Sequence, residues 1–142
     1  YLEVKLGEAI PGDDASLPGG KGSLSVKVQC ANWLDIDRVQ VLVNGRPEPK
    51  LNFTRKDNAQ MFGDGVVKFE HKLALSLDAD AHIIVVAVNE KSPIGDVMGS
   101  YYGKQHAVAM SNPIFVDVDG GGFKANGDTL GHPLPTKGQG SR

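Results

Sequence analysis

The sequence has 142 residues, 40% of them hydrophobic and 23% charged, which is enough for one buried core and too short for two full domains. Its 15 basic and 17 acidic residues are mixed along the chain and give a formal charge of −2, so neither nucleic acid nor an anionic membrane is an expected partner. No apolar run approaches the roughly 20 residues that span a bilayer, so we expect a soluble chain without membrane insertion. Cys30 is the single cysteine. It therefore forms no intramolecular disulfide, and its alternating neighbours favour a buried small hydrophobe over a nucleophile.

Apolar and polar residues alternate from the start of the chain, which predicts half-buried β-strands. The first covers residues 2–6, and two more cover residues 24–30 and 39–43. Residues 7–22 are rich in glycine and contain two prolines, a composition that predicts a long surface loop.

Asn44-Gly45 predicts a tight hairpin turn, because both residues tolerate the positive φ angles of a type I′ turn. The next strand, near Leu51 and Phe53, should therefore return antiparallel to residues 39–43. Its two prolines predict an edge strand, because proline donates no hydrogen bond to a neighbouring strand.

The second half of the chain predicts three further strands. Residues 67–77 alternate over their whole length, and residues 114–118 follow a proline. Residues 83–88 are apolar without alternation, which is typical of a central strand covered on both sides. We therefore predict an all-β fold, an immunoglobulin-like antiparallel β-sandwich of about seven strands. It forms a single domain over residues 1–118, followed by a Gly/Pro-rich C-terminal tail over residues 119–142.

Twelve residues are expected in the core because they lie on the apolar face of an alternating run or in the central strand. They are Leu24, Val26, Val28, Val39, Val41, Val43, Phe69, Leu73, Leu75, Ile84, Val86 and Val116. Trp33, the only tryptophan, lies next to a strand end and is also expected to be buried, so that truncation to alanine would cost about 3–5 kcal/mol.

Residues 117–128 resemble a calcium-binding loop, with Asp117, Asp119 and Asp128 at positions 1, 3 and 12 and a glycine at position 6. Position 5 is a glycine and position 12 is not the usual glutamate, so two ligand contacts are weakened or lost. We therefore expect an aspartate–glycine turn, with calcium binding no tighter than about 10⁻⁴–10⁻³ M. The three aspartates remain weak calcium candidates, and no cofactor is assigned.

The remaining candidates favour structural roles. Asp80 and His82 flank an alanine before the central strand, but a catalytic zinc site needs about three protein ligands. We expect Asp80 to accept backbone hydrogen bonds at a corner and His82 to pack at the strand start. His71 falls on the apolar side of its strand, where a bond to a backbone carbonyl is expected. No catalytic residue is assigned, so the chain is not expected to be an enzyme.

Three stretches of the chain resemble a known family. They are residues 1–4 (YLEV) with 11–13 (PGD), residues 33–39 (WLDIDRV) with Asn44-Gly45, and residues 111–117 (SNPIFVD). They are similar to the C-terminal β-domain of bacterial PHP-type metallohydrolases of the carbamate-hydrolase-like branch. The family's catalytic domain has an H-x-H motif that this chain lacks, so no catalytic residue is transferred.

The resemblance implies a non-catalytic accessory domain whose partner is an upstream catalytic domain of the same polypeptide. The start at Tyr1, without a methionine, leads to the same expectation. An extracytoplasmic origin is also implied, since many such proteins are exported. The alternative is a carbohydrate- or surface-binding module, for which exposed aromatic residues would be the signature. A stand-alone hydrolase that uses Asp80, His82 and a loop histidine with a metal ranks last.

Overall fold

The structure, a computed structural model, describes residues 1–132. Within this range the chain forms nine β-strands: β1 (Leu2–Leu6), β2 (Asp14–Ser16), β3 (Lys21–Gln29), β4 (Arg38–Val43), β5 (Arg46–Thr54), β6 (Val67–Ser76), β7 (Ala81–Pro93), β8 (His106–Met110) and β9 (Ile114–Asp117). Short helical segments lie between them: η1 (Pro18–Gly20), η2 (Ala59–Met61), η3 (Asp96–Met98) and α1 (Gly99–Tyr102). No helix in residues 1–132 is both long and apolar enough to cross a membrane.

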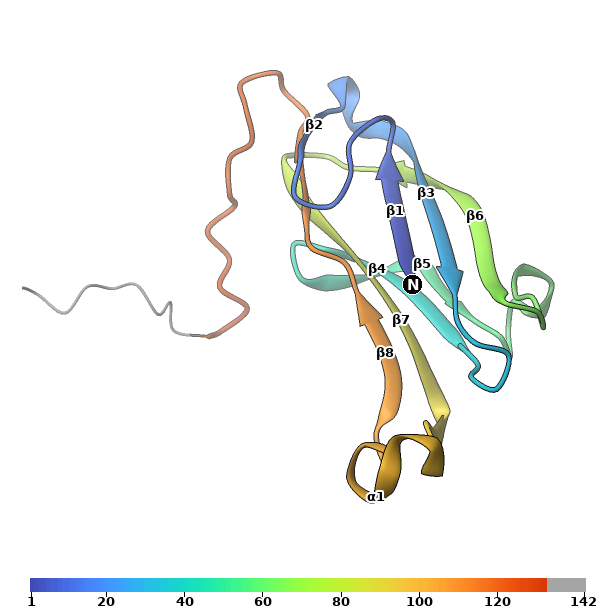
Figure 1. Cartoon of the computed structure of the whole chain (residues 1–142). Helices are drawn as coiled ribbons and strands as arrows, with labels where there is room; N and C mark the ends of the chain where they lie inside the picture. The colour runs from blue at the N-terminus through green and yellow to red at the C-terminus, as the bar shows by residue number, and fades with distance from the viewer. Residues whose placement is uncertain (133–142) are drawn as a thin grey trace, which may run out of the picture.

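The strands form two sheets that pack face to face (Figure 1). One sheet has the order β1-β3-β6, and the other has the order β2-β9-β7-β4-β5, with β8 also paired to β7. All pairings are antiparallel except that between β2 and β9, which is parallel. This order matches the A-B-E and G-F-C sheets of immunoglobulin-like domains. The predicted all-β, immunoglobulin-like sandwich is therefore confirmed.

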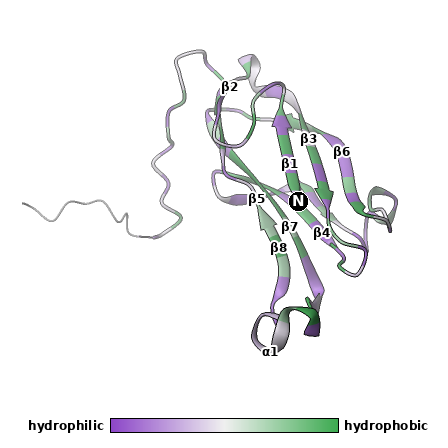
Figure 2. Ribbon diagram, viewed as in Figure 1, coloured by the Kyte–Doolittle hydropathy of each residue, from purple (hydrophilic) through white to green (hydrophobic). Residues whose placement is uncertain are grey.

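The core lies between the two sheets. The hydrophobic residues that build it are gathered on the strands (Figure 2). Its largest fully buried side chains are Phe69, Leu24, Ile83, Ile114, Val28, Val39, Val41, Val85 and Val116. Phe69 is the centre of an aromatic group, with ring centroids 5.8 Å from Phe53, 5.3 Å from Phe62 and 4.8 Å from His71. This group lies at the end of the sandwich where β5 finishes and β6 begins.

Most of the expected core is confirmed, but Val43 at the end of β4 is only partly buried, and the prediction of which β7 residues face inward was wrong. Ile83, Val85 and Ala87 point into the core, while Ile84 and Val86 are half-buried on the outer face of the sheet. The burial of β7 alternates although its sequence does not, because both faces are apolar. A continuous apolar run therefore correctly predicted a central strand and could not predict which residues face inward.

The expected burial of Trp33 was also wrong. Its side chain is 58% exposed in the β3–β4 loop, and Ile36 of the same loop is buried instead. A single aromatic residue outside an alternating run has no periodicity to show which way it points. Its size alone favoured burial, and the loop places it in solvent.

The hairpin prediction is confirmed in detail. Asn44 has φ 50° and Gly45 has φ 77°, and β5 is an edge strand paired only with β4. Residues 7–22, expected to form a loop, contain the three-residue strand β2 and the turn η1. The sequence analysis also missed β8, which pairs with the far half of β7.

Candidate functional site

One end of the sandwich brings together the features that could bind a partner. The strand pairings place the β3–β4 loop, the β5–β6 loop and the β7–β8 hairpin at this end (Figure 1). Tyr1 lies here too, because its backbone exchanges hydrogen bonds of 2.7 and 2.9 Å with Gln29 at the end of β3. We call this region the loop end. In antibody variable domains the corresponding end contains the antigen-binding loops.

A polar hollow of about 260 Å³ opens at the loop end. Its polar lining residues are Asn32, Asp35, Asp64, Lys68, Asn89 and Ser92, and Trp33, Leu34 and Pro93 complete its wall. We call it the Trp33 hollow. Trp33 and Asp64 lie at its mouth, since both side chains are largely exposed, whereas Lys68 and Asn89 are buried at its base.

Lys68 is an unusual residue for this position. Its side chain is only 3% exposed, yet its ammonium group donates no hydrogen bond to any residue in 1–132. Its ion-pair partner is Asp35, whose Oδ1 lies 3.9 Å from Lys68 Nζ, beyond hydrogen-bond range. Buried charges are normally both paired and hydrogen-bonded, because desolvation of an ammonium is costly. Lys68 thus offers unused donors toward the hollow.

Arg55 fixes the carboxylates on the wall of the hollow. It donates to Asp35 at 2.7 Å, to Asp64 at 3.1 Å and to the Gly63 carbonyl at 3.0 Å. Its guanidinium lies 5.3 Å from the ring centroid of Phe62, a cation–π contact. Together with Lys68, the site contains two positive and two negative side chains, so its formal charge is balanced.

The β7–β8 hairpin exposes a group of apolar residues. Val88 lies opposite Arg38, the first residue of β4, so the last part of β7 and the whole hairpin tip extend beyond β4. The exposed side chains, 49–72% accessible, are Val97, Met98, Tyr101, Tyr102, Val108 and Met110. We call them the hairpin patch. Grouped exposed apolar side chains of this kind mark interaction sites in many proteins.

An acidic cluster lies at the opposite end of the sandwich. Oxygen atoms of Asp80, Asp117 and Asp119 lie within 4.8 Å of one another. Their carboxylates already accept hydrogen bonds. Asp80 binds the backbone N–H groups of Val118 and Lys124, both at 2.9 Å, and Asp117 binds two glycine N–H groups at 2.7 and 2.9 Å.

Asp119 and Asp128 differ from the other carboxylates in their electrostatics. The backbone N–H of Gly121 and the ammonium of Lys124 lower the pKa of Asp119 below its usual value. Asp128 forms an ion pair with Arg46 at 2.6 Å. The pKa of Asp128 is also lowered, most strongly by the backbone N–H of Leu130 and then by the Arg46 guanidinium.

The calcium-loop pattern is thus divided in space. Asp117 and Asp119 join Asp80, a residue that the pattern did not include, while Asp128 reaches the β4–β5 turn to meet Arg46. The expected role of Asp80 as an acceptor at a corner is confirmed. The position of Asp80 beside β9 depends on the pairing of β7 with β9, which residue spacing in the loop does not reveal.

The histidines take part in backbone contacts. His71 Nε2 lies 2.8 Å from the Met61 carbonyl, as expected for a half-buried histidine, and His106 Nδ1 lies 2.8 Å from the Asn89 carbonyl. The backbone N–H of His82 donates a hydrogen bond to Asn44 Oδ1 at 3.0 Å. Burial raises the pKa of the Cys30 thiol, so its reactive thiolate form is disfavoured.

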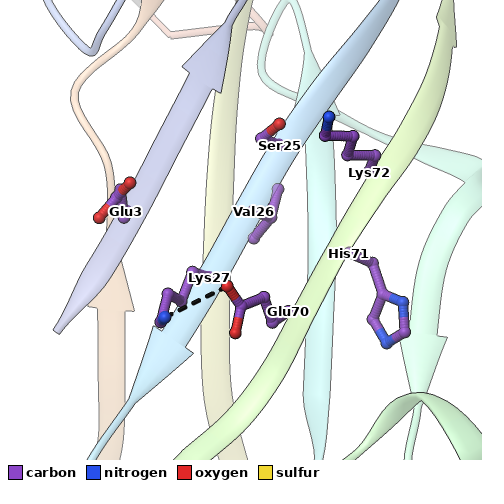
Figure 3. A pocket seen from close by; sticks show the side chains of 7 residues that line it. All are labelled: Glu3, Ser25, Val26, Lys27, Glu70, His71 and Lys72. Atoms are coloured by element: carbon purple, nitrogen blue, oxygen red, sulfur yellow. Dashed lines mark hydrogen bonds and ion pairs between the residues drawn. The ribbon is translucent and has the colours of Figure 1, made fainter.

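A second hollow of about 190 Å³ lies on the outer face of the β1-β3-β6 sheet (Figure 3). Most of its polar side chains come from alternating outward positions of the three strands, whereas His71 is on the same side of β6 as Phe69. Lys27 and Glu70 pair across β3 and β6 at 3.2 Å. The arrangement is that of a solvated sheet face with cross-strand charge pairs.

Comparison with protein-family models, with curated proteins and with solved structures found no match to this chain. The resemblance to the β-domain of PHP-type hydrolases therefore rests on the three sequence stretches alone.

Proposed function

We propose that this chain is a non-catalytic accessory domain of a larger metal-dependent hydrolase-like protein, and that the hairpin patch holds the catalytic domain joined before Tyr1. The observation that supports this proposal most directly is spatial. Tyr1 and the hairpin patch lie at the same end of the sandwich, so a domain attached at Tyr1 emerges beside the exposed apolar residues.

The shape of the loop end supports docking at this surface. The hairpin projects beyond the start of β4, and in Figure 1 it extends past the point where the chain begins. A domain linked to Tyr1 would therefore have the hairpin along its side. Burial of the patch would remove apolar surface from water at a gain of about 25 cal/mol per Å². Covalent linkage would reduce the entropic cost of association further.

Footprinting with hydroxyl radicals tests the docking directly, because methionine and tyrosine side chains are oxidised where they are exposed. In the full-length gene product, Met98, Met110 and the two tyrosines of the hairpin patch should be oxidised several-fold more slowly than in the isolated chain. Met61, which packs against the core, should react equally in both and serves as the internal control.

A matched pair of variants shows whether binding depends on the hairpin patch or on any exposed apolar residue. The preceding domain, produced separately, should bind the isolated chain at least about tenfold more weakly when Val108 and Met110 are both replaced by serine. Leu130→Ser, next to the β4–β5 turn at the opposite end and also partly exposed, should bind like the parent. A reading frame that starts at Tyr1, or equal oxidation in both proteins, would rule the proposal out.

A second candidate function is a carbohydrate- or surface-binding module. The exposure of Trp33 beside a polar hollow favours it, because an exposed tryptophan next to hydrogen-bonding groups is a feature of ligand sites. This function does not require a domain before Tyr1, so the two candidates can be tested separately.

A further inference from the structure

We propose that the Trp33 hollow is a binding site for a single neutral sugar ring, with Lys68 at its base as the main hydrogen-bond donor and Trp33 at its mouth as a stacking platform. This proposal rests on the second candidate function and gives it a site and a ligand class. It is independent of docking at the hairpin patch.

Lys68 Nζ has N–H donors that no residue in 1–132 accepts at hydrogen-bond distance. An ammonium has three such donors, and the only carboxylate within 4.0 Å of Lys68 Nζ in residues 1–132 is that of Asp35, 3.9 Å away. The side chain is 3% exposed, and Nζ keeps a small solvent contact at the base of the hollow. A ligand oxygen at the base of the hollow would complete its hydrogen bonding, which is worth most where the surroundings are partly desolvated.

The balance of charge around the hollow selects the class of ligand. Lys68 alone would favour an anion, but Asp35 and Asp64 line the same hollow and would repel one. A cation would be repelled by Lys68 and by Arg55 behind the carboxylates. A ring of hydroxyl groups can bind both to the ammonium and to the carboxylates, since each hydroxyl donates one hydrogen bond and accepts others. A neutral polyol is therefore preferred over an ion of either sign.

The aromatic residue at the mouth of the hollow suits a sugar ring. A sugar ring has an apolar C–H face that packs on an aromatic ring, while its hydroxyls remain free to bond with polar groups. Trp33 is 58% exposed, so this surface is available without any rearrangement of the core. The volume of about 260 Å³ falls below that of sites for drug-sized molecules, which suits one ring rather than an enclosed oligosaccharide.

The polar walls of the hollow are already held in place by hydrogen bonds. Arg55 holds both carboxylates, and the buried Asn89 side chain donates to Ser92 Oγ at 2.9 Å while accepting the Ser92 N–H at 3.2 Å. Polar groups that are ordered before binding lose little entropy when the ligand arrives. We expect a dissociation constant on the order of 1 mM for a single ring, because one ring offers few atoms for contact.

The sequence provides its own reporter, because Trp33 is the only tryptophan. The isolated chain is titrated with methyl glycosides of glucose, galactose and mannose and with N-acetylglucosamine, up to about 50 mM. Tryptophan emission is followed together with the backbone amide spectrum. At least one sugar should shift the emission and the amides of the β3–β4 loop, and glucuronate, the charged counterpart, should bind more weakly than glucose.

Lys68→Met is the decisive variant, because methionine fills a similar volume without the ammonium and should leave the fold intact. It should weaken sugar binding at least about tenfold while the melting temperature stays the same or rises. Replacement of Tyr101 and Tyr102 by serine is the control and should leave sugar binding unchanged.

Four outcomes would overturn the assignment. Three of them are the absence of any sugar-induced shift, parent-like binding by Lys68→Met, and tighter binding of glucuronate than of glucose. The fourth is loss of sugar binding in the tyrosine variant alone, which would place the sugar at the hairpin instead. None of these results bears on footprinting of the full-length protein, so the site and the docking proposal fail independently.

Discussion

Truncation of Phe69 and of Trp33 should lower the stability of this domain to very different extents. Phe69 is 1% exposed and packs against Phe53, Phe62 and His71, so Phe69→Ala removes a ring from the centre of the core. Such a change costs about 3–5 kcal/mol through lost burial and the cavity left behind. Trp33→Ala removes a larger side chain, but one that lies mostly in water, and should change the free energy of unfolding by no more than about 0.5 kcal/mol.

Thermal and urea unfolding followed by far-ultraviolet circular dichroism measures both variants without relying on the tryptophan signal. The unfolding entropy of a domain of this size is about 0.3 kcal/mol per kelvin, so Phe69→Ala should lower the melting temperature by about 10–17 °C. Trp33→Ala should lower it by less than about 2 °C. A loss of more than about 2 kcal/mol in Trp33→Ala, or of less than about 1 kcal/mol in Phe69→Ala, would refute this account of the core.

Three other variants or conditions test separate parts of the fold. Gly20→Ala should destabilise the domain by about 3 kcal/mol or more, because Gly20 has φ 68° and an added Cβ would overlap a backbone carbonyl of the adjoining turn; urea unfolding measures this. Calcium titration by calorimetry should show binding no tighter than about 10⁻⁴ M, and micromolar binding that is lost in Asp117→Ala/Asp119→Ala would contradict this. The Leu130 N–H and the Arg46 guanidinium lower the pKa of Asp128, so these contacts stabilise the tail at neutral pH and are lost as the pH falls through the lowered pKa. The protection of the amides of residues 128–132, measured as the exchange rate relative to the intrinsic rate at each pH, should therefore fall only in strong acid, and Asp128→Asn should lower it equally at neutral pH.

Local patterns in the sequence were sufficient for the architecture, because alternation and turn residues act over a few positions. The type I′ turn at Asn44-Gly45 and the edge position of β5 followed from single residues with strong backbone preferences. The parallel pairing of β2 with β9 could not be predicted in this way. It joins residues about a hundred positions apart through a strand of only three residues, which is too short to show a period.

The candidate sites show the same limit more strongly. Asp117 and Asp119 were found from their spacing in a loop, but Asp80 joins them only because β7 and β9 are neighbours in the sheet. The alternation of β6 predicts that Lys68 faces outward, and its sequence neighbours do not indicate that it is buried. Its burial comes from the loops that close over the end of β6. Sites built from the ends of several strands therefore require the tertiary structure to be recognised.

The lack of alternation in β7 can be understood once the outer face of the sheet is considered. Ile84, Val86 and Val88 are half-buried there, although no second layer covers that face in residues 1–132. Val86 and Val88 lie directly opposite Met110 and Val108 of the hairpin patch, so all four side chains share one face. A strand that only had to form a sandwich would place polar residues at these positions, as β6 does on its outer face. The apolar outer residues of β7 thus extend the hairpin patch along the sheet. If the hairpin patch holds the preceding domain, as we propose, the outer face of β7 would be buried with it, which would account for an apolar run that alternates in burial but not in sequence.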